Sequence, residues 1–175
     1  MSKVKKGIDI IIDQLTNSII HVSSGDTFET NCLPIIKEDL KLTLKKNGWL
    51  FSWKYEFKQA DRVVYKIVTD QEPDTIQGLV SLREQEHHIE LELIESAPHN
   101  RGTEKLYLGV AANMFAFACY QSKLAGHEGN IAFIAKTELI DHYESSIGAI
   151  HIGNHRMIIH EVAAEPLINR YFKDL

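Results

Sequence analysis

At 175 residues, the chain is long enough for one domain with a substantial core and too short for two ordinary domains. Hydrophobic residues make up 44% and charged residues 25%, the balance of a soluble globular protein, and the net charge of -5 argues against a nucleic-acid partner or an anionic membrane surface. No stretch approaches the ~18 consecutive apolar residues of a membrane span, and no signal-cleavage pattern follows the first apolar run. Cys32 and Cys119 are too few for a disulfide framework, so we expect a cytoplasmic protein.

The first quarter of the chain carries mixed signals. Residues 7–15 combine β-branched residues with Asp and Gln, which fits either a strand or a short helix. Residues 28–33 follow a turn signal and predict a strand. An apolar residue every fourth position over 36–46, with Gly48 after it, predicts an amphipathic helix with a glycine stop.

The next part predicts an antiparallel meander. Aromatic or apolar residues alternate over 49–57, which is a strand signal. Segments 62–68, 76–82 and 89–94 follow at hairpin spacing and are predicted as three more strands.

The second half predicts alternating helices and strands. We expect a long helix over 110–124, a strand over 131–135 and an amphipathic helix over 137–147. A strand pair or long bent strand over 151–162 and a short helix over 163–172 close the chain. With the strand at 89, the middle of the chain is a βαβα unit. Its glycine turn at Gly109 lies at the amino end of a helix, where backbone N–H groups and the macrodipole favour an anion.

A meander that leads into βαβα, with a glycine turn before the first helix, resembles the GCN5-related N-acetyltransferase family. Three stretches carry the resemblance: 89–96 with the loop after it, Leu-Tyr-Leu-Gly-Val-Ala over 106–111, and the tyrosine-containing segment 135–149. It is strongest over 49–172 of a single domain, 1–175. The resemblance implies an α/β (α+β) fold with a mixed, mostly antiparallel central sheet flanked by helices.

The family's phosphate loop has a Gln or Arg, two residues, a Gly, one residue and then Gly or Ala. A register that starts at Arg101 supplies the cation but places Glu104 where glycine is required. A register that starts at Leu106 recovers Gly109 and Ala111 but loses the leading Gln or Arg. We choose the second register.

In that register Lys105 or Arg101 supplies the missing charge, and the resemblance places the pantetheine arm of acetyl-CoA against the splayed end of the strand at 93–96. The residues assigned to the donor by the resemblance are Leu93, Ile94, Glu95, Ser96, Arg101, Lys105, Leu106, Tyr107, Leu108, Gly109, Val110, Ala111 and Thr137.

The resemblance also suggests catalytic groups. Tyr143 matches the tyrosine that can protonate the departing thiolate, although spacing alone favours a half-buried helix aromatic. Glu90 and Glu92 share one strand face, and either could accept the amine proton directly or through water, whereas a solvated face is the plainer interpretation. Glu95 points to the other face unless a β-bulge intervenes.

Other side chains favour structural roles. The nine histidines fit no standard zinc spacing, so we expect no metal. Trp49 and Trp53 could stack on a substrate, but the pattern favours core aromatics, and Cys119 has no evident His partner that would make it a nucleophile.

The resulting hypothesis is an acetyl-CoA-dependent N-acetyltransferase that acts on a primary amine by direct transfer, with acetyl-CoA as co-substrate and no membrane partner. One alternative is a non-catalytic acyl-CoA-binding or protein-interaction module, and a further one is a toxin-like aminoacyl-tRNA acetyltransferase, which the acidic charge disfavours. The sequence leaves a homodimer open and does not identify the acceptor.

Overall fold

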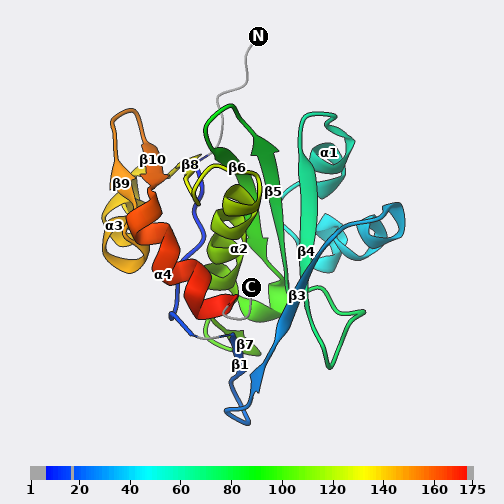
Figure 1. Ribbon diagram of the computed structural model, residues 1–175. Helices are drawn as coiled ribbons and strands as arrows, with labels where there is room; N and C mark the ends of the chain where they lie inside the picture. Colours follow the sequence, from blue (N-terminus) through cyan, green and yellow to red (C-terminus); the bar gives the residue numbers. More distant parts are fainter. Residues whose placement is uncertain (1–6, 17, 173–175) are drawn as a thin grey trace.

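The computed structural model describes residues 7–16 and 18–172, which fold around a seven-stranded sheet of order β3-β4-β5-β6-β8-β10-β9 (Figure 1). Among the described strands of this sheet only β6 and β8 pair in parallel, so the expected mixed, mostly antiparallel sheet is confirmed. The strands are β3 (Thr30–Pro34), β4 (Val63–Thr69), β5 (Gly78–Glu84), β6 (Ile89–Ser96), β8 (Ile131–Ile134), β10 (Arg156–Ile159) and β9 (Ile150–His151). A small second sheet contains β2 (Thr27–Phe28), β1 (Ile19–His21) and β7 (Tyr107–Leu108).

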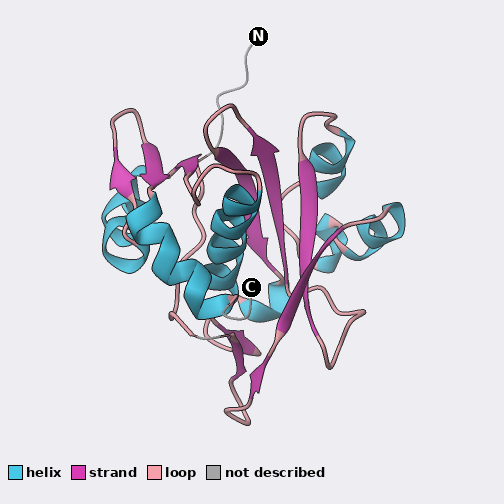
Figure 2. Cartoon of the chain, in the orientation of Figure 1, coloured by secondary structure: helices cyan, strands magenta, loops and turns pink. Residues whose placement is uncertain are grey.

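Helices cover both faces of the main sheet (Figure 2). The larger core lies between the sheet and α2 (Val110–Leu124), with α4 (Glu161–Tyr171) and α3 (Ile140–Ile147) contributing to it. The smaller core lies on the opposite face, under α1 (Trp53–Lys58). Four short 3₁₀ helices complete the described chain: η1 (Lys37–Leu42), η2 (Lys45–Asn47), η3 (Pro98–Asn100) and η4 (Thr137–Leu139).

Helix α2 is the centre of the larger core. Its sequence is apolar on every side, and the helix is enclosed by β5, β6 and β8 on one side and by α4 on another. Phe115 packs edge-on against Phe133 of β8, with ring centroids 5.4 Å apart. Cys119 is fully buried and burial raises the pKa of its thiol, which disfavours the thiolate that a nucleophile needs. Helix α2 is therefore packed between the sheet and α4, which fixes the position of the helix.

The strand predicted over 49–57 is wrong, because the second half of this segment belongs to helix α1 (Trp53–Lys58) and the first half is irregular. Ser52 caps the helix, and its hydroxyl accepts the Tyr55 N–H at 3.3 Å. Trp49 and Trp53 are four residues apart and both are buried in the smaller core, whereas Tyr55 is 57% exposed. The alternation was therefore incidental, and the prediction of core tryptophans is confirmed. The first strand of the meander is β3 instead.

Two further predictions in the first quarter need correction. The amphipathic helix over 36–46 is replaced by η1 and η2, although Gly48 does end the second of them, with φ +97°. Of its predicted apolar stripe only Leu40 packs against the smaller core, whereas Ile36 is 57% and Leu44 37% exposed. Residues 7–15 are neither strand nor helix. They run in an irregular path with one isolated bridge, from Ile8 to Ala135.

The remaining elements follow the prediction closely. Helix α2 has the predicted bounds, and the predicted strand over 131–135 is β8. The C-terminal strand pair and helix are β9, β10 and α4.

A β-bulge in β6 decides which side chains share a face. Ser81 of β5 pairs with Leu93, whereas the neighbouring Leu82 pairs with Leu91, so Glu92 is the extra residue. As a result Leu93 packs in the smaller core while Ile94 packs in the larger one. The bulge that the sequence left open is therefore present, and it turns Glu95 toward α1. The predicted placement of Leu93 beside Ile89 and Leu91 is wrong for the same reason.

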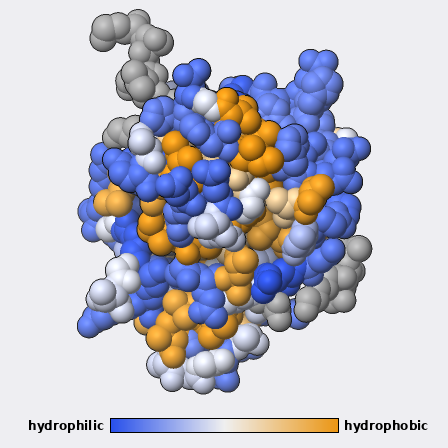
Figure 3. Space-filling model, turned by 90° about the vertical axis from the view of Figure 1, so that its left-hand side faces the viewer, coloured by the Kyte–Doolittle hydropathy of each residue, from blue (hydrophilic) through white to orange (hydrophobic). Residues whose placement is uncertain are grey.

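The surface mixes apolar and polar patches. Figure 3 shows apolar side chains between hydrophilic ones on the face that carries α3, β9 and α4. Ile150, Ile152 and Val162 are exposed there, with Val162 87% exposed. None of the helices in residues 7–16 and 18–172 is long and apolar enough to cross a membrane.

Candidate functional site

The site is created by two strands that separate. β6 and β8 pair through only two residue pairs, Ile89 with Ile131 and Glu90 with Ala132, and β6 then continues to Ser96 away from its neighbour. A cavity of about 420 Å³ lies at this opened edge. Its lining comes from the end of β6, the loop after it, the first turn of α2, the turn before α1 and the N-terminal segment: Asp9, Ile10, Ile11, Asp13, Leu50, Phe51, Ile94, Glu95, Ser96, Asn100, Arg101, Gly102, Lys105, Val110 and Ala111.

Gly109 is the residue immediately before α2, as predicted. Its φ is +85°, in the left-handed region that favours glycine. A β-carbon there would collide with the Thr16 hydroxyl and lie 3.1 Å from the Ser18 carbonyl oxygen. The Gly109 N–H donates to Asp13 Oδ1 at 3.1 Å. The Gly109 N–H therefore binds an anion, and in this structure that anion is the carboxylate of Asp13.

The two candidate cations lie on the cavity wall, each beside a carboxylate. Lys105 Nζ is 3.1 Å from Asp13 Oδ2. Arg101 Nη1 is 3.2 Å from Glu95 Oε2, and its other terminal nitrogen donates to the Gly48 carbonyl. Leu106, which stands where the family has Gln or Arg, is 48% exposed and does not line the cavity.

Tyr143 is enclosed in the larger core. Its ring is fully buried against Phe115 and Phe133, and its hydroxyl donates to the Ile10 carbonyl oxygen at 2.6 Å. Burial is the main cause that raises the pKa of this hydroxyl. Tyr143 does not line the cavity, but the Ile10 residue that its hydroxyl contacts does.

The two candidate bases lie on the sheet face opposite α2, and neither lines the cavity. Glu90 is 2% exposed and pairs with Arg156 at 2.6 Å and His88 at 3.1 Å. Glu92, at the bulge, pairs with Arg83 at 2.7 Å. Because neither carboxylate lines the cavity, a proton from the cavity would have to reach them through other groups.

Glu95 is the carboxylate that the bulge brings to the cavity. Its side chain is 3% exposed, and its oxygens accept the Leu50 N–H at 2.7 Å and the Trp53 indole N–H at 2.8 Å, in addition to the ion pair with Arg101. These contacts fix the turn before α1 against the end of β6. It shapes one wall of the cavity.

The structure thus brings together part of the predicted donor set. Ile94, Glu95, Ser96, Arg101, Lys105, Val110 and Ala111 line the cavity, and Gly109 lies beside it. Tyr107 and Leu108 form β7 and pair with β1 instead. Leu93 packs in the smaller core, and Thr137 is exposed, with its hydroxyl 3.1 Å from His155 Nδ1.

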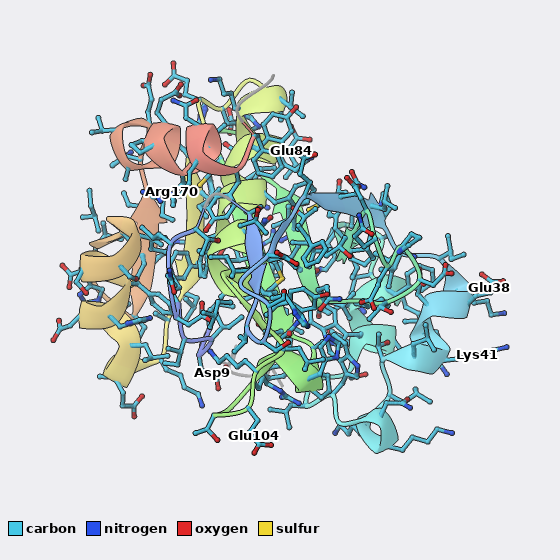
Figure 4. All side chains as sticks on the ribbon, turned by 90° about the horizontal axis from the view of Figure 1, so that it is seen from below. Asp9, Glu38, Lys41, Glu84, Glu104 and Arg170 are labelled. Carbon is cyan, nitrogen blue, oxygen red and sulfur yellow. The ribbon has the colours of Figure 1, made fainter. Side chains whose placement is uncertain are left out.

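Sequence reasoning missed the N-terminal side of the site. Asp9, Ile10, Ile11 and Asp13 line the cavity, yet residues 1–48 matched the family only loosely. No pattern in a single sequence indicates that Asp13 contacts residues 105 and 109. In the view from below, Asp9 lies on the same side of the molecule as Glu104 and opposite Arg170 of α4 (Figure 4).

Metal ligands are not gathered anywhere in the part of the chain that the structure describes: no group of three or more His, Cys, Asp or Glu residues there could hold an ion.

No family model and no curated protein matches the sequence. Among solved structures, mutant forms of the spermidine/spermine N-acetyltransferase SpeG from Vibrio cholerae superpose with a TM-score of 0.57 at 16% identity, over 79% of this chain and 97% of that chain. The same enzyme in complex with manganese ions gives a TM-score of 0.57 at 16% identity, over 79% and 96%. At 16% sequence identity the structural similarity is evidence for the fold alone. The opened β6–β8 edge, the glycine turn before α2 and these superpositions together show that the chain has the fold of the GCN5-related N-acetyltransferases.

Proposed function

We propose that this chain is an acetyl-CoA-dependent N-acetyltransferase that transfers the acetyl group directly to a primary amine. The observation that carries the proposal is the cavity at the opened β6–β8 edge, which meets the first turn of α2 in a fold shared with amine acetyltransferases. The open edge of β6 and the amino end of α2 offer an extended ligand two different kinds of contact. An arm with amide groups can pair along Ile94–Ser96, and a phosphate can accept backbone N–H groups at Gly109.

The reaction needs few groups. The amine nitrogen attacks the thioester carbonyl carbon, a C–N bond forms and the C–S bond breaks. The thiolate takes one proton, which we assign to the Tyr143 hydroxyl, and the attacking nitrogen loses one, which we assign to Glu92 or Glu90 through water. Backbone N–H groups at the end of β6 polarise the acetyl carbonyl.

Each carboxylate at the cavity is paired with a cation, so the charge of the lining is nearly balanced. Three carboxylates, Asp9, Asp13 and Glu95, line it together with two cations, Arg101 and Lys105. The superposed Vibrio cholerae enzymes are spermidine/spermine N-acetyltransferases by name, so polyamines are the first acceptors to test.

The runner-up is a non-catalytic acyl-CoA-binding module. One observation favours it: the Tyr143 hydroxyl donates to the Ile10 backbone carbonyl, and Tyr143 does not line the cavity. Turnover separates the two functions, because both predict donor binding.

A thermal shift experiment with CoA, acetyl-CoA and ATP tests both. Acetyl-CoA at ~100 times its dissociation constant stabilises the fold by roughly 2.7 kcal/mol, and ATP, which lacks the pantetheine arm, serves as the control. If neither CoA species shifts the melting temperature, both functions are excluded. If CoA binds and no amine is acetylated, the result supports the non-catalytic acyl-CoA-binding module.

A further inference from the structure

The N-terminal segment, residues 8–16, crosses the candidate donor site from β8 to α2. At its first end it extends the edge of β8. The Ile8 N–H donates to the Ile134 carbonyl oxygen at 2.6 Å, and the Lys136 N–H donates to the Ile8 carbonyl oxygen at 3.1 Å. Ile8 and Ile12 are 2% and 6% exposed, so the segment is docked by apolar side chains as well.

The middle of the segment lies against α3. The Tyr143 hydroxyl donates to the Ile10 carbonyl oxygen at 2.6 Å, and the Ile12 N–H donates to His142 Nε2 at 2.9 Å. The hydroxyl that the proposed reaction needs as an acid is thus already used to hold backbone.

The last part of the segment occupies the turn before α2. Asp13 contacts two groups there, the Gly109 N–H through Oδ1 and Lys105 Nζ through Oδ2, both at 3.1 Å. Thr16 fills the space above Gly109, where its hydroxyl would block a β-carbon. A carboxylate therefore holds the backbone donor and the cation that a pyrophosphate would use.

We propose that residues 8–16 are an autoinhibitory strap, which rests on the proposed function: while docked, they hold the phosphate turn and the Tyr143 hydroxyl closed to the donor. One short stretch of chain thus engages the two groups that would face opposite ends of the pantetheine arm, the Gly109 N–H and the Tyr143 hydroxyl. The donor binds only when the strap releases the Gly109 turn, so its apparent affinity is reduced by the fraction of molecules in which the turn is released.

The chain offers a variant at each end of the strap. Asp13→Ala removes the carboxylate from Gly109 and Lys105. Gly7→Ala adds a β-carbon 2.6 Å from the Lys136 nitrogen and 2.7 Å from the Ala135 carbonyl carbon, both backbone atoms, so the strap has to shift from β8. Asp26→Ala is the control, because it removes the same charge from an exposed turn.

The experiment measures binding of CoA and of inorganic pyrophosphate by calorimetry in the full chain, with hydrogen exchange at the Gly109 amide. We expect Asp13→Ala to bind CoA about tenfold more tightly than the unmodified chain, the order of effect that loss of one charge-assisted contact has on an opening equilibrium. Gly7→Ala shifts affinity in the same direction, exchange at Gly109 accelerates, and Asp26→Ala changes nothing.

The outcomes separate the strap from the proposed function. If all four proteins bind CoA equally, the strap is overturned and the proposed function stands. If none binds CoA but Asp13→Ala gains pyrophosphate binding, the closed phosphate turn stands and the proposed function falls. If neither variant gains affinity for either probe, the strap is wrong.

Discussion

Replacing Gly109 by Ala tests the turn on which the site depends. Two costs add. An alanine at φ +85° pays roughly 1–2 kcal/mol for the left-handed conformation. Its β-carbon also displaces Thr16, which is 4% exposed and whose N–H donates to the Tyr171 hydroxyl at 2.9 Å, a further cost of about 1–2 kcal/mol. We therefore expect Gly109→Ala to lower the free energy of unfolding by about 2–4 kcal/mol.

Gly102→Ala is a matched control. Gly102 has φ +77°, but a β-carbon there meets no atom within 4 Å, so only the conformational cost applies. Urea unfolding followed by the fluorescence of the buried Trp49 and Trp53 measures both variants. Adding Thr16→Ala to Gly109→Ala removes the obstructing hydroxyl and restores part of the loss. The reasoning fails if Gly109→Ala costs no more than Gly102→Ala, or if Thr16→Ala gives no relief.

Three further predictions follow from buried polar groups. Tyr143→Phe leaves the Ile10 carbonyl without its donor, so we expect urea unfolding to show a loss of about 1–3 kcal/mol of stability. If Tyr143 is the acid, the turnover of Tyr143→Phe is also roughly 100-fold lower. Unchanged turnover would show that Tyr143 has only a structural role. Glu95→Gln removes the charge that faces Arg101 and the Trp53 indole, so we expect urea unfolding to show a loss of roughly 2 kcal/mol of stability. An unaltered urea midpoint would contradict the assigned contacts. Burial lowers the pKa of His99 below its usual 6.5, so the unfolded chain binds the proton more readily than the folded chain. The free energy of unfolding therefore falls as the pH drops below about 6.5. His99→Asn should flatten that part of the plot of stability against pH, and an equally steep plot would refute the assignment to His99.

The sequence predicted the second half of the fold well because local and tertiary preferences agree there. The apolar run over 110–124 has the length of a helix and ends at Ala125-Gly126, and every residue over 110–119 is buried, so local and tertiary preferences both favour the helix. Over 49–57 two patterns coincide, since Trp49, Trp53 and Phe57 are both alternate and four residues apart. The Ser52 cap and the burial of Trp53 decide for the helix, and neither is visible from alternation.

The candidate site could be predicted only where its residues are close in sequence. Gly109, Val110 and Ala111 come from one turn, and their position before a helix was predictable. The contacts of Asp13 span more than 90 positions of the chain, and no local pattern encodes them. The bulge at Glu92 is similar, because a single extra residue in one strand changes every later side-chain direction and leaves no mark in composition.

The most direct test of the central claim is release of free CoA thiol from acetyl-CoA in the presence of spermidine, spermine and a panel of other primary amines, with mass spectrometry of the acceptor. The unmodified chain and Asp13→Ala are run side by side, so that a closed strap is not mistaken for inactivity. We predict one acetyl group added to an amine nitrogen for each thiol released, with faster turnover by Asp13→Ala at low acetyl-CoA. If CoA binds to Asp13→Ala and neither protein acetylates any amine in the panel above the enzyme-free rate, the chain is not the acetyltransferase proposed here.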